Sequence, residues 1–329
     1  MNDTATHLSD KPMRVLLLGA TGTAGQGTAR ALVAAGHDVT CLVRRAASAE
    51  ALPGRVSIRE GDVTDAGALR KVMREGAFDA VVSCLASRTG SPKDAWAIDY
   101  QAHHDALEAA KEAGIGQFVL LSAICVQKPL LEFQRAKLAF EAELQASGLT
   151  WSIVRPTAFF KSLSGQVQRL RDGKPFLLFG DGRLTACKPI SDDDLGRFIA
   201  SCLTDPDRQN RILPVGGPGP ALTAREQGEL LFDAMGMEPK FRQVPVALMD
   251  AIIGVSSLLG RFSSKWSERA EFARIGRYYA TESMLVWDEA SGRYDADATP
   301  EFGTETLADH YRRIVAEGAE VDLREHAVF

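Results

Sequence analysis

The sequence lacks the cysteine pattern of a metal-binding or disulfide-linked protein. Its five cysteines are scattered, their number is odd, and no two of them form a CxxC pair. Zinc sites, iron–sulfur clusters and disulfide frameworks all need paired or closely spaced cysteines. Scattered thiols are typical of a reducing compartment. We therefore expect no metal site and an intracellular setting.

Long apolar runs and an excess of basic residues are also missing. The longest apolar stretch, residues 244–259, contains Pro245 and Asp250. It is shorter than the roughly 20 residues that a membrane span needs. Residues 1–12 are polar and lack the apolar core of a secretory signal. The net charge is −5, whereas nucleic-acid-binding proteins usually show a basic domain or stripe. These absences predict a cytoplasmic protein that binds no nucleic acid.

What is present is an alternation of short apolar runs with longer helical patterns. The predicted helices lie between the strands, near residues 23–36, 65–74, 94–113 and 131–147. Buried strands that alternate with helices indicate a parallel sheet covered on both faces. The fold class is therefore α/β, a Rossmann-type doubly wound parallel sheet. The predicted strands are residues 13–19, 38–45, 56–63, 79–86, 117–123 and 150–156.

The pattern becomes less regular after about residue 160. Thr223 and Glu226 form a capping box that opens a helix running to about Met235, and residues 244–286 read as helical and apolar. We expect a flexible N-terminal tail (1–12), a Rossmann-type cofactor domain (13–160) and a smaller C-terminal substrate-covering part (161–329). Because strands of the last part are expected to join the same sheet, that boundary is soft.

A glycine-rich motif, GATGTAG, lies between the first strand and the first helix. In that context Gly19 permits a tight turn, Gly22 lets the backbone approach a pyrophosphate, and Gly25 allows close helix–strand packing. The helix N-terminus adds N–H groups and the positive end of a dipole. The alternative is a plain glycine-rich turn. The predicted cofactor loop comprises Gly19, Thr21, Gly22, Thr23, Ala24 and Gly25.

The ends of the second and third strands refine the cofactor. An acid after the second strand would bind the ribose hydroxyls of NAD, but this chain has Arg44 and Arg45 there, which suit a 2′-phosphate. This favours NADPH, unless the two arginines are only a solvated patch. Asp62 and Val63 end the third strand and suit the edge and face of an adenine ring. Alternatively, Asp62 only caps its own turn.

These residues resemble the short-chain dehydrogenase/reductase superfamily, in its extended or atypical branch. The glycine motif, GDVTD at 61–65, LLSA with Ser122, VRPTAFF at 154–160 and ISDDDLGRFIA at 190–200 all fit. Typical members carry a Tyr four residues before a catalytic Lys, whereas this chain has Phe133 before Lys137. A helix-surface lysine is the alternative reading of Lys137. The resemblance implies catalytic roles for Lys137 and Ser122, and a nicotinamide pocket containing Leu85, Ala86, Lys137, Pro156, Thr157 and Phe159.

A closer resemblance is to the NADPH-dependent 8-vinyl reductases of chlorophyll and bacteriochlorophyll synthesis. It rests on residues 84–102, 120–141 and 154–166, above all on the CLASR–KDAW block and the Phe in FQRAK. It implies reduction of the 8-vinyl group of divinyl chlorophyllide or protochlorophyllide to ethyl. Plant members carry a transit peptide, and this chain starts almost directly with its first strand, so we expect a bacterial cytoplasmic enzyme. A location at the periphery of the photosynthetic membrane is the alternative.

Two other functions stay open at this stage. An NmrA-like redox sensor would bind NADP without turning it over, and an isoflavone-reductase-like enzyme would reduce another conjugated small molecule. The retained Lys137 and the CLASR–KDAW block favour the vinyl reductase over both. The apolar residues 244–259 and 272–280 are then expected to cover a flat tetrapyrrole. Alternatively, residues 244–259 dock loosely on a membrane surface.

Overall fold

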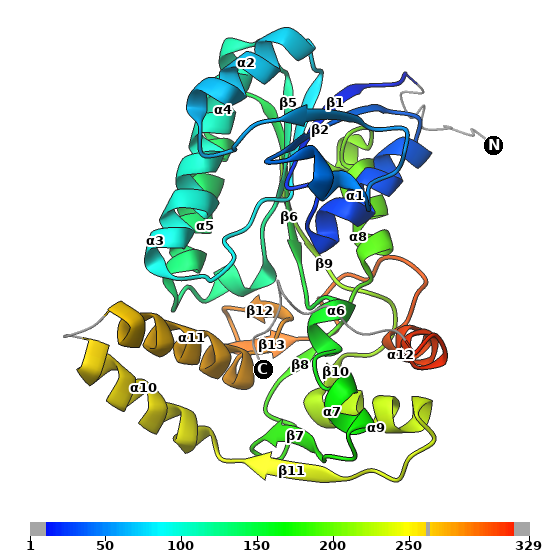
Figure 1. Ribbon diagram of the computed structural model, residues 1–329, viewed down its shortest axis with the longest axis vertical. Helices are drawn as coiled ribbons and strands as arrows, with labels where there is room; N and C mark the ends of the chain where they lie inside the picture. The colour runs from blue at the N-terminus through cyan, green and yellow to red at the C-terminus, as the bar shows by residue number, and fades with distance from the viewer. Residues whose placement is uncertain (1–10, 261–263, 319–329) are drawn as a thin grey trace.

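The computed structural model describes residues 11–260 and 264–318, so the predicted N-terminal tail lies almost wholly outside the described part (Figure 1). A parallel sheet with the strand order β3-β2-β1-β4-β5-β6-β9 forms its centre. The order reverses between β1 and β4, as in doubly wound folds, which confirms the predicted fold class. The strands are β1 (Arg14–Leu18), β2 (Asp38–Val43), β3 (Ser57–Glu60), β4 (Ala80–Ser83), β5 (Gln117–Leu121), β6 (Thr150–Pro156) and β9 (Arg211–Val215).

Helices cover both faces of this sheet. Side chains alternate along each strand, so Leu16 and Leu18 point to one face, and Val15 and Leu17 to the other. The first face packs against α2 (Ala66–Gly76), α4 (His103–Glu112) and α5 (Glu132–Gln145). The second packs against α1 (Thr23–Ala34) and α8 (Asp192–Ser201). All four of these strand residues are fully buried, so the two clusters form the core.

Some predicted elements differ in detail from the structure. The fourth strand, expected over 79–86, is limited to β4 (Ala80–Ser83). The third strand was expected to reach residue 63, but β3 ends at Glu60, because the Asp62 side chain accepts from the Thr64 N–H and turns the chain. The helix expected over 94–113 is three pieces: α3 (Pro92–Ala95), the π-helical segment η2 (Trp96–Ala102) and α4. Short 3₁₀ turns lie elsewhere at η1 (Ala46–Ala49), η3 (Ile124–Gln127) and η4 (Pro206–Arg208).

The remaining elements form a second layer below the carboxyl ends of the strands (Figure 1). A separate apolar cluster, with Phe160, Phe232 and Tyr311 fully buried, holds part of this layer together. Its strand pairs are β7 (Phe176–Phe179) with β11 (Phe241–Val244), β8 (Ala186–Cys187) with β10 (Leu222–Thr223), and β12 (Val286–Asp288) with β13 (Arg293–Asp295). Its helices are α6 (Phe160–Leu163), α7 (Val167–Arg171), α9 (Ala224–Ala234), α10 (Val246–Gly260), α11 (Ser264–Thr281) and α12 (Leu307–Ala316).

Helix α9 begins at the predicted capping box of Thr223 and Glu226.

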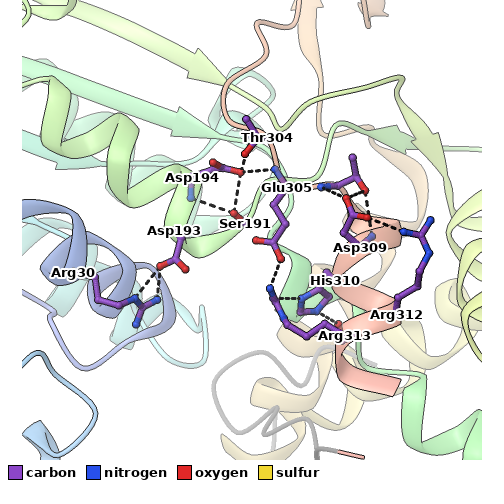
Figure 2. A network of polar contacts seen from close by, with 12 residues as sticks. Arg30, Ser191, Asp193, Asp194, Thr304, Glu305, Asp309, His310, Arg312 and Arg313 are labelled. Carbon is purple, nitrogen blue, oxygen red and sulfur yellow. Dashed lines mark hydrogen bonds and ion pairs between the residues drawn. The ribbon is translucent and has the colours of Figure 1, made fainter. Parts of the chain in front are cut away.

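The chain returns to the main sheet after residue 190, where it contributes α8 and the edge strand β9. A polar network then ties the C-terminal segment to α8 (Figure 2). The buried Asp194 carboxylate accepts from the backbone N–H groups of Thr304 and Glu305 at 3.3 and 3.1 Å. The two layers are therefore joined by polar bonds as well as by the chain itself.

None of the helices in the described ranges is long and apolar enough to cross a membrane. Within the same ranges, no group of three or more His, Cys, Asp or Glu side chains is arranged to hold a metal ion.

Candidate cofactor and active site

The glycine turn after β1 has a backbone that only glycine suits. Gly19 has φ +74°, and a Cβ there would lie 2.7 Å from the backbone carbonyl of Cys84. A Cβ on Gly25 would lie 2.1 Å from the Gly19 oxygen. The turn is thus packed tightly against both the start of α1 and the loop after β4. A turn without side chains lets the protein backbone come close to the pyrophosphate of a cofactor that lies across the strand ends.

Helix α1 begins at a glycine, which has no side chain to cap the helix. Its N-cap is Gly22, no side chain makes a cap hydrogen bond, and no acid occurs in its first turn. Such an N-terminus attracts an anion through its N–H groups and its dipole. The residues present therefore fit the pyrophosphate of a dinucleotide.

Arg44, Arg45, Asp62 and Val63 lie at the next two strand ends, as expected for an adenosine site. Both arginines directly follow β2 and are exposed. Asp62 accepts from the N–H and hydroxyl of Thr64 at 2.9 and 2.8 Å. Those bonds, more than the nearby Arg44, lower the pKa of Asp62. The geometry thus shows Asp62 capping its own turn, and its adenine contact stays a prediction.

Lys137 is buried and bound to a carboxylate that the sequence analysis missed. Its ammonium lies 2.9 Å from Oδ1 of Asp99, whose side chain is fully buried in the π-helical segment. The Ser87 N–H also donates to this oxygen, at 3.2 Å. The other oxygen, Oδ2, is buried and has no hydrogen-bond partner among the described residues. Lys137 is therefore not a solvated helix-surface lysine, and the site holds one unsatisfied acceptor.

A neutral histidine lies beneath this ion pair. His103 bonds to the Ser83 hydroxyl at 2.9 Å and to the Ile98 carbonyl at 3.0 Å. Because a carbonyl only accepts, Nδ1 carries the proton and Nε2 accepts from Ser83. Burial, and then the charge of Lys137, lower the pKa of His103 to about 4. At neutral pH His103 therefore adds no charge beside the Asp99–Lys137 pair.

Phe133 lies one helical turn before Lys137, in an apolar cluster shared with α11. This cluster includes Ile275 and Tyr278 of α11, and a Cβ on Gly90 would touch both Phe133 and Ile275. The Tyr278 hydroxyl donates to the Cys125 carbonyl at 2.9 Å. Helix α11 therefore borders the face of α5 that carries Lys137.

The other residues of the predicted nicotinamide pocket lie where β5 and β6 end. The Ser122 hydroxyl donates to Oε1 of Glu141 at 2.5 Å, and the Thr157 hydroxyl donates to the Lys188 carbonyl. Ser122, Pro156 and Thr157 are buried, whereas Phe159 is half-buried. These contacts are structural, and roles of these residues toward a cofactor stay predictions.

The loop after β4 contacts both the glycine turn and the buried Lys137–Asp99 pair. A Cβ on Gly19 would lie 2.9 Å from the Leu85 nitrogen, and Ser87 binds Asp99. Leu85 is half-buried and Ala86 is exposed. The structure thus brings the glycine turn, Leu85 and the Lys137 pair to one edge of the sheet.

Two charged residues near this edge escaped the sequence analysis. Asp99 lies in KDAWAID, where an acid in a helix gives no signal of its partner. Lys161 follows VRPTAFF, and its ammonium donates to the Thr23 hydroxyl at 3.2 Å. The only available signal for Lys161 was a cation directly after the motif that ends β6.

Comparisons with known proteins identify the family of the chain. Residues 19–206 match a family model described as NAD(P)H-binding. The chain is 49% identical to "Divinyl chlorophyllide a 8-vinyl-reductase, chloroplastic" of Cucumis sativus, over 97% of this chain and 80% of that protein. It is 48% identical to the protein of the same name in Arabidopsis thaliana, over 94% of this chain and 78% of that protein.

Solved structures share the fold at low sequence identity. One is the NADPH-dependent quinone oxidoreductase QOR2 of Escherichia coli in complex with NADPH, at 17% identity and a TM-score of 0.66. The superposition covers 91% of this chain and 99% of that one. At this identity the likeness describes the fold alone.

The expectation of a bacterial cytoplasmic protein is wrong. Four curated relatives at 47–49% identity are all named as chloroplastic enzymes of plants. Scattered thiols and a Rossmann-type fold suit the interior of an organelle as well as a bacterial cytoplasm, so the observations used could not separate the two.

Proposed function

The chain belongs to the family of divinyl chlorophyllide a 8-vinyl-reductases, and we propose that it reduces the 8-vinyl group of a divinyl chlorophyllide or protochlorophyllide to ethyl with NADPH. The observation that carries this proposal is the identity of 49% with a named reductase over 97% of the chain. The buried Lys137, the apolar residue at 133 and the uncapped N-terminus of α1 support it.

The residue at 133 suits a substrate without a carbonyl group. A vinyl group has no oxygen that could accept a proton from a tyrosine hydroxyl, so Phe133 removes nothing that this reaction needs. NADPH, when bound, supplies a hydride, and a proton from water would complete the ethyl group. Negative charge that develops on the vinyl substrate spreads into the conjugated macrocycle, which reduces the need for a strong acid nearby. The protein mainly has to orient the two reactants.

Lys137 and Asp99 are proposed to orient the cofactor through hydrogen bonds. An ammonium has three N–H donors, and the Asp99 bond uses one of them. The remaining donors suit the hydroxyls of the nicotinamide ribose. Asp99 offsets the charge of Lys137, so the pair fixes position more than it supplies net charge. The unsatisfied Asp99 Oδ2 offers an acceptor to a bound hydroxyl or water.

The function is tested by mixing the purified protein with NADPH and 3,8-divinyl chlorophyllide. We expect a shift of the Soret band that is matched by oxidation of one NADPH for each pigment reduced. NADPH binding without oxidation, with either the chlorophyllide or the protochlorophyllide, would instead support a redox sensor. Oxidation with a different conjugated acceptor only would support an isoflavone-reductase-like enzyme.

Preference for NADPH over NADH is proposed from Arg44 and Arg45, which directly follow β2 with no acid beside them. Loss of charge-assisted bonds to the 2′-phosphate should weaken NADPH binding roughly tenfold to hundredfold. The measurement is KM for both nucleotides in Arg44→Ala and Arg45→Ala. An unchanged NADPH/NADH ratio in both variants would defeat the assignment.

The C-terminal part, residues 161–329, is proposed to cover the tetrapyrrole. Within it, we assign contact with the pigment to α11 and contact with a membrane surface to α10. Helix α11 borders Phe133 and is placed to contact the pigment. Helix α10 packs on α11 (Figure 1), and it carries an exposed apolar outer face. Each large side chain of this outer face is at least 38% exposed: Leu248, Ile252, Val255, Leu258 and Leu259.

This outer face is proposed to rest loosely on an anionic membrane surface. Residues 240–281 contain seven Lys and Arg against three Asp and Glu, a net +4 in a chain whose total is −5. An apolar helix face with surrounding positive charge suits anionic lipid. The test is sedimentation with vesicles of phosphatidylglycerol or of phosphatidylcholine. Val255→Asp should abolish binding to the anionic vesicles, whereas Leu184→Asp, at another exposed leucine, should not. Equal binding by wild type and Val255→Asp would contradict the proposal.

A further inference from the structure

We propose that Lys161 binds the pyrophosphate of the cofactor, so that the phosphate site is built from both layers of the molecule. Lys161 lies on α6, in the C-terminal part, yet its ammonium donates to the Thr23 hydroxyl at 3.2 Å. Thr23 is the first residue of α1, next to the N-cap Gly22. This inference rests on the proposed binding of NADPH.

The charge of a pyrophosphate at the N-terminus of α1 favours a positively charged side chain nearby. A pyrophosphate bridge carries two negative charges, whereas a helix N-terminus contributes only about half a positive charge. The first turn of α1 contains neither an acid nor a base. Arg30, farther along α1, is engaged at the surface with Asp193 at 2.7 Å. Lys161 therefore brings a full positive charge to the uncapped end of the helix.

Asp192 is the acidic neighbour that Lys161 faces. The charges of Arg30 and Lys161 lower the pKa of this carboxyl, but burial outweighs them and raises it to about 6. Asp192 begins α8, and a Cβ on Gly27 of α1 would meet its backbone oxygen. The acid is thus held by the packing of α1 against α8, and the hydrogen bond that the structure gives the ammonium is the one to Thr23.

The position of Lys161 is fixed by the C-terminal helix. The Tyr311 hydroxyl of α12 donates to the Leu163 carbonyl of α6 at 2.9 Å, and His310 bonds to the Ser164 hydroxyl at 3.0 Å. Helix α12 is held in turn by the polar network around Asp194 and Glu305 (Figure 2). A side chain that is already ordered loses less entropy when its ligand arrives.

The experiment is a fluorescence titration of Lys161→Gln and Lys161→Arg with NADPH, NADH and adenosine 2′-monophosphate. Lys161→Gln should weaken NADPH and NADH binding alike, by about tenfold to hundredfold, because both carry the pyrophosphate. Its affinity for adenosine 2′-monophosphate, which lacks the pyrophosphate, should not change. Lys161→Arg should recover most of the loss.

Matched variants separate this role from a general effect. Lys174→Gln removes a surface lysine that pairs with Asp172, and should bind all three nucleotides as wild type does. Arg44→Ala should weaken adenosine 2′-monophosphate but spare NADH. Unchanged NADPH affinity in Lys161→Gln, or an equal loss for all three nucleotides, would overturn the inference and leave the proposed function standing. Wild-type protein that fails to bind NADPH would overturn both.

Discussion

At the scale of single residues, the chemistry depends on one buried ion pair and one missing hydroxyl. Lys137 lies 2.9 Å from Asp99, and both side chains are nearly or fully buried. Breaking such a pair leaves an uncompensated charge in the interior, which typically costs about 3–5 kcal/mol. Phe133 lies on the same face of α5 among apolar neighbours. The site therefore places an ammonium where the nicotinamide ribose is expected, without a tyrosine hydroxyl at position 133.

We predict opposite results for substitutions at these two positions. Lys137→Met should slow single-turnover reduction at least about tenfold, because the ammonium proposed to position the nicotinamide ribose is lost. Phe133→Tyr should stay close to wild type, because the vinyl group offers no oxygen for a new hydroxyl to protonate. Stopped-flow absorbance at the Soret band measures both. A fully active Lys137→Met protein with normal NADPH binding would eliminate the assigned role.

At the scale of elements, the cofactor helix α1 depends on α8, which follows it by more than 150 residues. The two helices meet at glycines. A Cβ on Gly196 would lie 2.4 Å from the backbone of Gly27, and a Cβ on Gly27 would lie 2.2 Å from the Asp192 oxygen. Backbone contact this close leaves no room for a methyl group. The C-terminal part thus positions the helix whose N-terminus is proposed to hold the phosphates.

A pair of glycine-to-alanine variants tests this packing. Gly196→Ala should lower the free energy of unfolding by about 1–3 kcal/mol, because the added methyl forces the helices apart. Gly254→Ala in α10, where nothing lies within 4 Å of the new Cβ, should raise it by up to about 1 kcal/mol through helix propensity. Urea unfolding followed by circular dichroism measures both. Equal changes in the two variants would show that α1 and α8 are not in such close contact.

At the scale of the whole molecule, the two layers are coupled through charged groups as well as through the core. The network around Asp194 ties the C-terminal segment to α8, and Arg30 ties α8 to α1 (Figure 2). Asp192 lies at the same junction, where burial raises its pKa to about 6 from an ordinary value of 3.8. The stability of the fold therefore depends on pH through this carboxyl.

The sign of this dependence follows from proton binding. Between about pH 4 and pH 6 the folded protein keeps a proton on Asp192 that the unfolded chain has lost, so the free energy of unfolding decreases as pH rises. Asp192→Asn removes this decrease. We expect its stability relative to wild type to grow through that window, by at most about 3 kcal/mol, and then to level off.

Urea unfolding at a series of pH values from about 4 to about 7.5 measures this difference, since other titrating groups are common to both proteins. The matched control is Asp193→Asn, which removes the neighbouring exposed carboxylate that pairs with Arg30 but leaves Asp192 to titrate. A constant difference between Asp192→Asn and wild type over the whole series would contradict the assignment of this carboxyl.

Features that depend on local pattern could be predicted from the amino-acid sequence alone. Alternating apolar strands and helices predicted the doubly wound sheet, and the strand–glycine–helix order at residues 19–25 predicted the cofactor turn, because each of these needs only neighbouring residues. The capping box at Thr223 opens α9 as predicted. The vinyl reductase family was predicted from short blocks of residues, and the comparisons confirm it. The compartment was predicted wrongly, since no local sequence pattern of this fold encodes it.

The polar contacts between distant residues became visible only in the folded molecule. Asp99 reaches Lys137 because a π-helical segment turns it inward beside α5, and Lys161 reaches Thr23 across 138 residues of sequence. Side chains so far apart in the sequence are brought together by the order of the strands and the packing of the helices. The spacing of residues along the chain does not predict such contacts. The same reason applies to β9 and α8, which belong to the later half of the chain yet complete the sheet and support α1.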